Sequence, residues 1–432
     1  MHGRIVIISA SVGAGHDGAA DQLTDRLRLF GYEVDRHDFL DLLPAGLGAL
    51  LAGSYHHLLT WAPTIYQRIY AATESADRPG PAIRALLRAA ERRTLRAVGP
   101  GAVAVISTYP GASQVLGALR LRGLLDVLAL TYLTDFSVHG LWVAPGIDAH
   151  LAVHPVPAAQ AHALGAAGVQ VCGPVVDPRF VPGDEEDRRL ARLRFGLPGP
   201  ASLALLVAGS WGVGAVRQAA AEIRDSGVAV PVVVCGRNEA LAERLCADGI
   251  EHVFGWVWDM PELMHACDVL VQNAGGLTSL EAFATGLPTA GYRCIPGHGR
   301  TNAAALQDAG LAAWIRHPAD LKPVLQALLD GETGKRQRAR GLALFADTRG
   351  PAESIAIHCL RPTAPTSPTA TKTPAPRRRA PRRPTLVAAA LAVTALLGIG
   401  APLAEAYADA PSRYPAVTRF LEGHEAYEGH AR

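Results

Sequence analysis

The chain has 432 residues, enough for two domains of ordinary size and further segments. Its formal net charge is only +2 and 6% of its residues are aromatic, which argues against a nucleic-acid-binding protein. Its six cysteines lack C-x-x-C spacing, which argues against a disulfide framework or a zinc site. We therefore expect small core cysteines in a reducing compartment, no nucleic-acid partner, no bound metal and no cofactor.

The N-terminal region is predicted to form a strand, a glycine turn and a helix. Residues 4–9 have the pattern of a buried strand, and residues 19–30 have a helical pattern. The turn between them contains three glycines in G-x-G-x-x-G spacing: Gly13, Gly15 and Gly18. This spacing is also typical of dinucleotide-binding oxidoreductases, in which an acid placed like Glu33 or Asp35 binds a ribose. His16 argues against that class, because it brings an acid/base group into the middle of the turn.

A stretch without formally charged residues follows at 42–67. Glycines and Pro63 interrupt it, so a spanning helix is not expected. Two interpretations remain open. The stretch could form a membrane-facing entrance through which a lipid reaches the protein, or it could form apolar helices that cover a sheet. Five arginines follow on a predicted helix: Arg84, Arg88, Arg92, Arg93 and Arg96. They can meet anionic lipid headgroups or form an ordinary solvated helix face.

Strand and helix patterns alternate up to about residue 345, which predicts two α/β domains with parallel, doubly wound sheets. Strands of the first domain are expected at 4–9, 32–35, 102–107, 127–132, 149–153 and 170–172. Those of the second are expected at 203–208, 230–235, 252–255, 268–272 and 289–291, with 312–315 as a sixth. The crossing is placed at 173–178, which gives domains of 1–174 and 175–360. A cleft between such domains would bind ligands at the carboxyl ends of the strands.

A second glycine corner, at 273–281, joins a predicted strand to a predicted helix. Gly275 and Gly276 allow close approach of a ligand, and the helix N-terminus favours an anion. Thr278 and Ser279 add hydroxyl groups, while Glu281 can accept from a sugar hydroxyl. This strand-to-helix turn is suited to bind a nucleoside diphosphate. A turn whose glycines are needed only for packing would have the same sequence pattern.

The composition changes at residue 361. Residues 361–384 are rich in Pro, Thr, Ala and Arg and are expected to form a disordered linker. Residues 386–404 carry no formal charge and would span roughly 28 Å as a helix, close to the thickness of a bilayer core. We therefore expect a transmembrane helix at 385–406 and a short tail at 407–432. The arginines that precede the span predict a single-pass cell-membrane protein with residues 1–384 in the cytoplasm.

Taken together, these motifs resemble family 28 glycosyltransferases of the GT-B fold, and most closely the monogalactosyldiacylglycerol synthases and diacylglycerol glucosyltransferases. In the first half the resemblance rests on residues 11–16 and 134–136, on His139 and Trp142, and on 173–175 with Phe180. In the second half it rests on 208–214, 235–238, 254–257 and 273–288. The order and spacing of these pieces make the oxidoreductase interpretation a minor alternative.

The resemblance implies an inverting transfer of a hexose from a nucleotide sugar, with UDP-hexose the expected donor, to a lipid such as diacylglycerol. The implied catalytic residues are His16, as base, and Asp135, as alternative base or as the group that orients a histidine. The implied acceptor-binding residues are Gly13, Gly15, His139 and Trp142. The implied donor-binding residues are Gly209, Ser210, Gly212, Gly214, Arg237, Trp256, Val257, Gly275, Gly276, Thr278, Ser279, Glu281, His298 and Asn302.

The chain departs from the family in one loop. Where the family carries Pro-Gly-Gln-Glu before an Asn, this sequence has Pro296-Gly-His-Gly-Arg-Thr-Asn302. His298 and Arg300 can replace the lost contacts to the sugar, or they can form an exposed basic loop. The change leaves two other functions open: a soluble-type nucleotide-sugar enzyme that acts like an epimerase, and an inactive GT-B binding protein.

Overall fold

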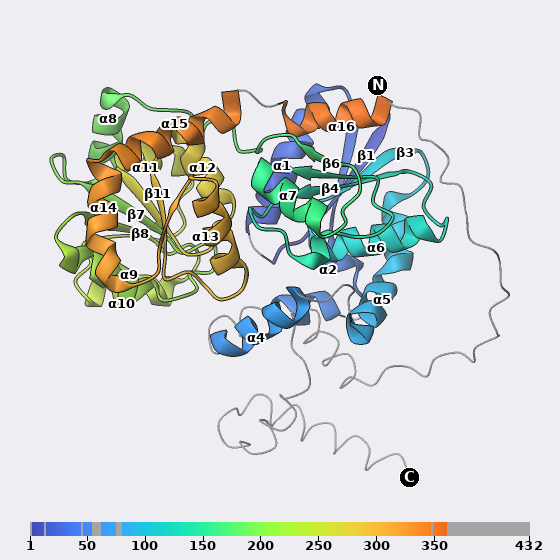
Figure 1. Ribbon diagram of the computed structural model, residues 1–432, viewed down its shortest axis with the longest axis horizontal. Coiled ribbons are helices and arrows are strands. Elements are labelled where there is room, and N and C mark those ends of the chain that lie inside the picture. The colour runs from blue at the N-terminus through green and yellow to red at the C-terminus, as the bar shows by residue number, and fades with distance from the viewer. Residues whose placement is uncertain are drawn as a thin grey trace, which may run out of the picture.

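The computed structural model describes residues 2–12, 14–44, 46–53, 62–74, 80–346 and 349–360. Two α/β bodies lie side by side, each with a central sheet between layers of helices (Figure 1). The linker, membrane span and tail expected from the sequence at 361–384, 385–406 and 407–432 lie outside the described residues. Within the described part, no helix combines the length and apolarity that a membrane crossing needs.

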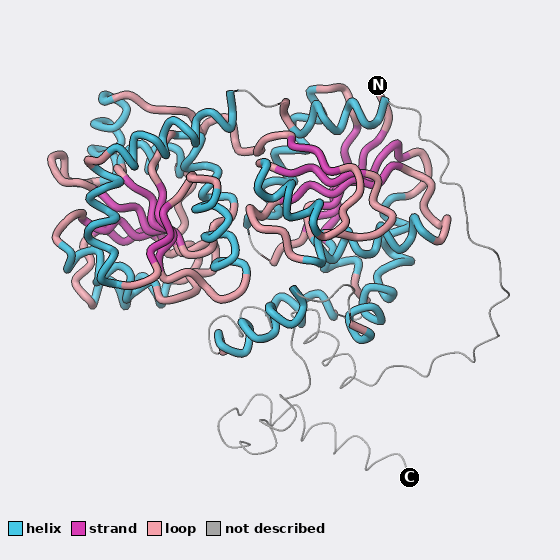
Figure 2. Tube along the Cα trace, in the orientation of Figure 1, coloured by secondary structure: helices cyan, strands magenta, loops and turns pink. Residues whose placement is uncertain are grey.

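The first sheet has six parallel strands in the order β2-β1-β3-β4-β5-β6. Figure 2 shows the strands of each body in magenta, with helices in cyan around them. Its strands are β1 (Arg4–Ser9), β2 (Glu33–Asp38), β3 (Ala102–Ser107), β4 (Leu128–Leu133), β5 (Ala149–Ala152) and β6 (Val169–Val171). Helices in this part of the chain include α1 (Ala14–Leu29), α2 (Phe39–Leu42), α4 (Pro63–Glu74), α5 (Pro81–Val98), α6 (Pro110–Leu121), η1 (Gly140–Trp142) and α7 (Pro155–Ala163).

The second sheet is also parallel and has the order β12-β11-β10-β7-β8-β9. Its strands are β7 (Leu203–Val207), β8 (Val230–Val234), β9 (His252–Phe254), β10 (Val269–Gln272), β11 (Thr289–Tyr292) and β12 (Ala313–Ile315). The remaining helices are α8 (Glu185–Phe195), α9 (Val216–Ser226), α10 (Glu239–Ala247), α11 (Met260–Ala266), α12 (Leu277–Thr285), α13 (His298–Asp308), η2 (Pro318–Asp320), α14 (Leu321–Leu329), α15 (Glu332–Ala346) and α16 (Pro351–Leu360).

The two parallel α/β domains expected from the sequence are confirmed. Every residue of β4 and of β7 is buried, because helices cover both faces of each sheet and leave no solvated side. The least accurate strand prediction is the second, which was expected at 32–35 and is found at Glu33–Asp38. β2 is an edge strand whose exposed positions carry Arg36 and neighbouring polar residues, so its end gives no apolar signal.

The last described helix, α16, packs on the first domain and not on the second. α16 packs against α1 and β4 of the first domain, and its His358 Nε2 lies 3.1 Å from Gln170 Oε1. Figure 1 shows α16 beside the first sheet, although the boundary predicted from the sequence assigns residues 175–360 to the second domain. The chain therefore crosses between the domains twice: once after β6 and once before α16.

Candidate active site

His16 lies in the first turn of α1, just beyond the carboxyl end of β1. The side chain is half-buried, and its Nδ1 lies 2.9 Å from Thr134 Oγ1, which follows β4. The imidazole also contacts the rings of Tyr109 and Trp142, at centroid distances of 5.5 and 5.9 Å. Because Nδ1 is held by Thr134, the ring orientation is fixed and Nε2 is the nitrogen that would meet a substrate.

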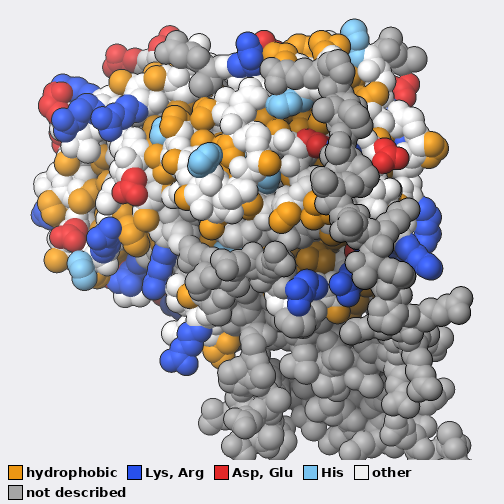
Figure 3. Space-filling view, turned by 45° about the vertical axis from the view of Figure 1, so that its right-hand side comes forward, with side chains coloured by type: hydrophobic (Ala, Val, Ile, Leu, Met, Phe, Trp, Pro, Cys, Tyr) orange, Lys and Arg blue, Asp and Glu red, His pale blue; other side chains and the backbone are white. Residues whose placement is uncertain are grey.

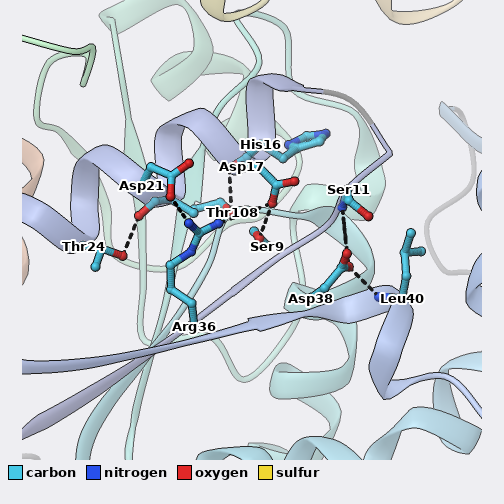
Figure 4. A network of polar contacts seen from close by, with 11 residues as sticks. Ser9, Ser11, His16, Asp17, Asp21, Thr24, Arg36, Asp38, Leu40 and Thr108 are labelled. Carbon is cyan, nitrogen blue, oxygen red and sulfur yellow. Dashed lines mark hydrogen bonds and ion pairs between the residues drawn. The ribbon is translucent and has the colours of Figure 1, made fainter. Parts of the chain in front are cut away.

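Polar contacts fix the start of α1 on the sheet (Figure 4). Ser9 Oγ donates to Asp17 Oδ1 at 2.5 Å, and Arg36 on β2 forms an ion pair with the same carboxylate at 3.5 Å. Asp38 accepts from the Ser11 backbone N–H at 3.3 Å, which holds the chain before the turn. The His16 side chain points away from α1 on a different side from Asp17 in this view. The network therefore fixes the helix that carries His16 and does not engage the imidazole itself.

Asp135 follows Thr134 and is also half-buried. Its Oδ2 accepts a hydrogen bond from Trp142 Nε1 at 3.2 Å. Trp142 is only 1% exposed, so its expected contact with an acceptor does not fit the structure. Its indole instead orients Asp135 and packs against His16.

His139 was also expected to bind the acceptor, but it is buried and caps η1 with its own ring. Nδ1 accepts from the Leu141 backbone N–H at 3.1 Å, and the Tyr70 ring lies 4.7 Å away. Burial lowers the pKa of His139 to about 4, against smaller opposing effects from Tyr70 and Asp135. The imidazole is therefore neutral near pH 7, and its visible role is to hold the loop that carries Trp142.

Asn302 joins the two domains instead of lining the donor site as expected. It is fully buried, and its Oδ1 accepts from the backbone N–H and the hydroxyl of Ser137 at 2.8 and 2.9 Å. Its Nδ2 donates to the Ala274 carbonyl at 3.1 Å and points at Asp135 Oδ1 at 3.5 Å. With these bonds made, the carboxamide has little capacity left for a ligand.

The glycine motif at the N-terminus serves the domain interface. Gly13 lies outside the described residues, while Gly15 and Gly18 lie in α1 against Leu277 at the start of α12. A Cβ added at Gly18 would stand 2.5 Å from Leu277 Cδ2. Glycine at this position therefore lets α1 approach α12 closely, which brings the His16 turn next to the second domain.

In the second domain, two loops follow the adjacent strands β7 and β10. The loop at 208–214 contains Gly209, Ser210, Gly212 and Gly214. Asn238 Nδ2 donates to the carbonyls of Trp211 and Gly212, at 3.2 and 3.3 Å, and Asn273 Nδ2 donates to the Val213 carbonyl at 2.9 Å. These amides hold the loop beside the point where the strand order reverses, which is the usual ligand position in such sheets.

The loop after β10 leads into α12, as the sequence predicted. A Cβ added at Gly276, the N-cap residue, would meet nothing within 4 Å, so the helix N-terminus opens onto unfilled space. Thr278 is half-buried in the first turn. Ser279 Oγ is buried and has no hydrogen-bond partner in the part of the chain that the structure describes. Backbone N–H groups and hydroxyls are thus grouped where an anion would be stabilised.

Glu281 lies one turn further along α12 and is half-buried. Burial raises the pKa of Glu281 to about 7, and the nearby Asp177 acts in the same direction. Among the residues that the structure describes, this carboxyl forms no hydrogen bond. An acid in this state suits a ligand that supplies hydroxyl groups.

Arg237, Trp256 and Val257 lie on the loops after β8 and β9. The Arg237 guanidinium lies over the Trp256 ring at 4.8 Å, and Trp256 is 39% exposed. Trp258, which the sequence did not single out, is 82% exposed and meets Trp256 edge-on at 5.9 Å. The loops thus present an accessible aromatic and cationic surface beside the glycine loops.

His298 begins α13 and is half-buried between the domains, with Tyr66 OH 3.2 Å from its Nδ1. Burial lowers the pKa of His298; the charge of Asp135 opposes this shift and His16 adds to it. The sequence did not predict a role for Tyr66, Gln67 or Tyr70 of α4. The sequence indicated only that these residues lie on one side of a helix. The neighbouring residues gave no indication of a contact with a partner about 230 residues away in the chain.

Known proteins resemble the chain in sequence. The monogalactosyldiacylglycerol (MGDG) synthase family matches residues 16–176. A processive diacylglycerol beta-glucosyltransferase of Bacillus subtilis is 29% identical over 246 residues, which cover 54% of this chain and 63% of the relative. Its counterpart in Bacillus pumilus is 31% identical over 212 residues, covering 46% and 54%. The chain thus spans little more than half the length of these relatives.

Solved structures match the fold over most of the chain. The Streptomyces glycosyltransferase SsfS6, complexed with thymidine diphosphate, has a TM-score of 0.52 and 16% identity, and the match covers 83% of this chain and 99% of that one. The Anabaena protein HepE, in complex with UDP-glucose, has a TM-score of 0.52 and 12% identity, with 83% and 98% covered. The resemblance seen in the sequence is thereby confirmed: the chain has the GT-B fold and is similar to family 28 glycosyltransferases of the MGDG synthase and diacylglycerol glucosyltransferase type.

Proposed function

We propose that the protein transfers a hexose from a nucleotide sugar, UDP-hexose in the first instance, to the hydroxyl of a membrane lipid such as diacylglycerol. The observation that carries this proposal is the juxtaposition of two unlike loop systems. His16 is in the first turn of α1, which packs through Gly15 and Gly18 against Leu277 at the start of α12. Asp135 Oδ1 lies 3.5 Å from Asn302 Nδ2 of α13, so both residues at the carboxyl edge of the first sheet meet the second domain, where α12 follows the glycine loop after β10. The names of the Bacillus relatives support the lipid acceptor, and HepE with its UDP-glucose supports the donor class.

The reaction is a single displacement. The acceptor oxygen attacks the anomeric carbon from the side opposite the diphosphate, the bond from that carbon to the phosphate oxygen breaks, and the configuration inverts. His16 Nε2 takes the proton of the acceptor hydroxyl, while Thr134 holds Nδ1. Asp135 stabilises the imidazolium that forms. The nucleoside diphosphate leaves with the electron pair.

The departing diphosphate needs positive potential, which the second domain supplies. The α12 N-terminus with Gly275, Gly276 and Thr278 would hold it, together with the loop at 208–214. Glu281 would accept from the ribose hydroxyls, and the Arg237–Trp256 pair would flank the base. No step requires a metal ion in this scheme.

We also propose that the protein works at the cytoplasmic face of the cell membrane. Four arginines on α5 are exposed and form no ion pair within the described residues: Arg84, Arg88, Arg92 and Arg96. The fifth, Arg93, instead donates to the Leu43 carbonyl at 2.7 Å. In Figure 3, basic side chains gather toward the margins of the described surface, and hydrophobic and histidine side chains occupy its middle. Each arginine contributes about 1 kcal/mol near an anionic leaflet.

The direct test is transfer into lipid. The full chain in mixed micelles containing diacylglycerol is incubated with radiolabelled UDP-glucose or UDP-galactose, and the organic phase is extracted and separated by thin-layer chromatography. We expect label in a glycolipid, with one hexose strongly preferred. Free labelled sugar or an epimerised nucleotide sugar would indicate the epimerase-like alternative. Binding of UDP without turnover of either donor would indicate a GT-B binding protein.

A further inference from the structure

A helix of the first domain reaches across to the second. α4 lies beside the start of α13, which carries the loop that departs from the family pattern. Three hydrogen bonds join them: Gln67 Oε1 accepts from Gly297 N at 2.8 Å, Tyr66 OH meets His298 Nδ1 at 3.2 Å, and Tyr70 OH meets Thr301 Oγ1 at 3.2 Å. The three α4 residues are one, three or four positions apart, so they share one side of the helix.

Apolar contacts place the same side of α4 on the donor loops. Tyr66 and Ile295 are each only 5% exposed and form a small cluster of their own. Val213 and Ala274 pack against this cluster. Val213 belongs to the glycine loop after β7, and Ala274 belongs to the one after β10. The cluster that Tyr66 of α4 forms with Ile295 therefore adjoins both loops that would cradle a diphosphate.

The substituted loop fits α4 closely. Gly297 has a φ of 70°, and a Cβ at this position would lie 2.7 Å from the Tyr66 ring and 2.8 Å from the Tyr70 ring. Only glycine therefore allows this approach. His298, the next residue, is close enough to His16 and Asp135 for their charges to act on it, so it stands near both candidate catalytic residues.

We infer that α4 forms one wall of the sugar end of the donor site, where Tyr66 positions His298 to hold a hydroxyl of the donor hexose. This inference rests on the proposed function and adds a residue of the acceptor domain to the donor site. When the Tyr66 hydroxyl donates to Nδ1, the neutral imidazole carries its proton on Nε2 and donates it to a sugar oxygen. The pair thus takes the place of the Gln-Glu side chains that this loop lacks.

The test compares a nucleotide with and without its sugar. Titration calorimetry measures the Kd of UDP and of UDP-hexose, using the hexose that wild type transfers, for Tyr66→Phe, His298→Asn and the control Tyr32→Phe. Tyr66→Phe keeps the ring and loses only the hydroxyl, so we expect UDP-hexose binding to weaken about three- to tenfold and UDP binding to change less than twofold. Tyr32 lies just before β2, at the amino ends of the parallel strands and away from the carboxyl ends that carry His16 and Asp135, so its variant should bind both ligands as wild type does.

His298→Asn separates a structural from a ligand-binding role. Asparagine keeps a polar atom near Nδ1 for Tyr66 but has none at the position of Nε2, so we expect at least the loss seen in Tyr66→Phe. The inference would be overturned if either variant weakened the binding of UDP and of UDP-hexose equally, or if His298→Asn bound UDP-hexose as wild type does. The proposed function would still hold in these cases, provided that the wild type transfers the hexose to lipid. A wild-type protein that binds UDP but no UDP-hexose would overturn both.

Discussion

Replacing Asn302 with alanine should loosen the contact between the domains. The change removes the acceptor for the buried Ser137 N–H and the donor to the Ala274 carbonyl. Ser137 Oγ keeps Thr301 as a partner at 2.8 Å. Two backbone groups are thus left without partners, at about 1–3 kcal/mol each, and the second is discounted because Ala274 is only half-buried. We expect a loss of about 2–4 kcal/mol in the free energy of unfolding.

Thermal denaturation measures this loss. At about 2–4 °C for each kcal/mol, the Tm of Asn302→Ala should fall by roughly 4–16 °C. Asn302→Asp is the matched variant: it still accepts from Ser137 but cannot donate to Ala274, and it brings a second carboxylate toward Asp135. Its buried acid would have a raised pKa, so its deficit should shrink as the pH falls. A Tm within 1 °C of wild type for Asn302→Ala would refute the assigned hydrogen bonds.

Three further predictions address the donor site and the membrane. Burial raises the pKa of Glu281 from 4.5 to about 7, so the contribution of this carboxyl to stability is present at low pH and is lost as the pH rises through 7. The Tm of Glu281→Gln relative to wild type should therefore increase from pH 5 to pH 8. A Tm difference that stays constant over this range would contradict the raised pKa. Gly212→Ala places a Cβ 2.8 Å from the Cys235 carbonyl oxygen at a φ of 59°, which strains the loop at 208–214. UDP binding measured by calorimetry should therefore weaken about tenfold. Unchanged UDP binding would show that this loop does not touch the nucleotide. Full-length protein should stay with membranes in a carbonate wash and a chain truncated after Leu360 should be released; release of both would show that residues 386–404 do not span the bilayer.

The sequence predicted the fold because its signals are local. Apolar runs such as residues 203–207 and 269–272 mark buried parallel strands, and the glycine corner at 275–276 marks a strand-to-helix turn. His16 could be named for the same reason: a histidine in a glycine turn at the end of a strand stands at the usual binding edge of such a sheet.

Residue roles that depend on distant partners could not be predicted. Asn302 looked like a donor ligand until its carboxamide was found bonded to Ser137, 165 residues away in the chain. Trp142 was expected from its motif to bind the acceptor, but it is buried by packing that the motif does not encode. The role of Tyr66 depends on where α4 lies in space, and the return of α16 to the first domain depends on which surface covers its apolar side.

The central claim, that this site carries out hexosyl transfer with His16 as the base, is tested most directly by His16→Ala. Both forms are assayed for label transferred from UDP-hexose to diacylglycerol and for UDP binding. The account predicts a fall of about 10²–10⁴-fold in kcat, with the Kd for UDP within a few-fold of wild type, because His16 belongs to the first domain and the nucleotide loops to the second. Transfer by the variant at the wild-type rate would contradict the assignment of His16 and would leave Asp135 as the candidate base.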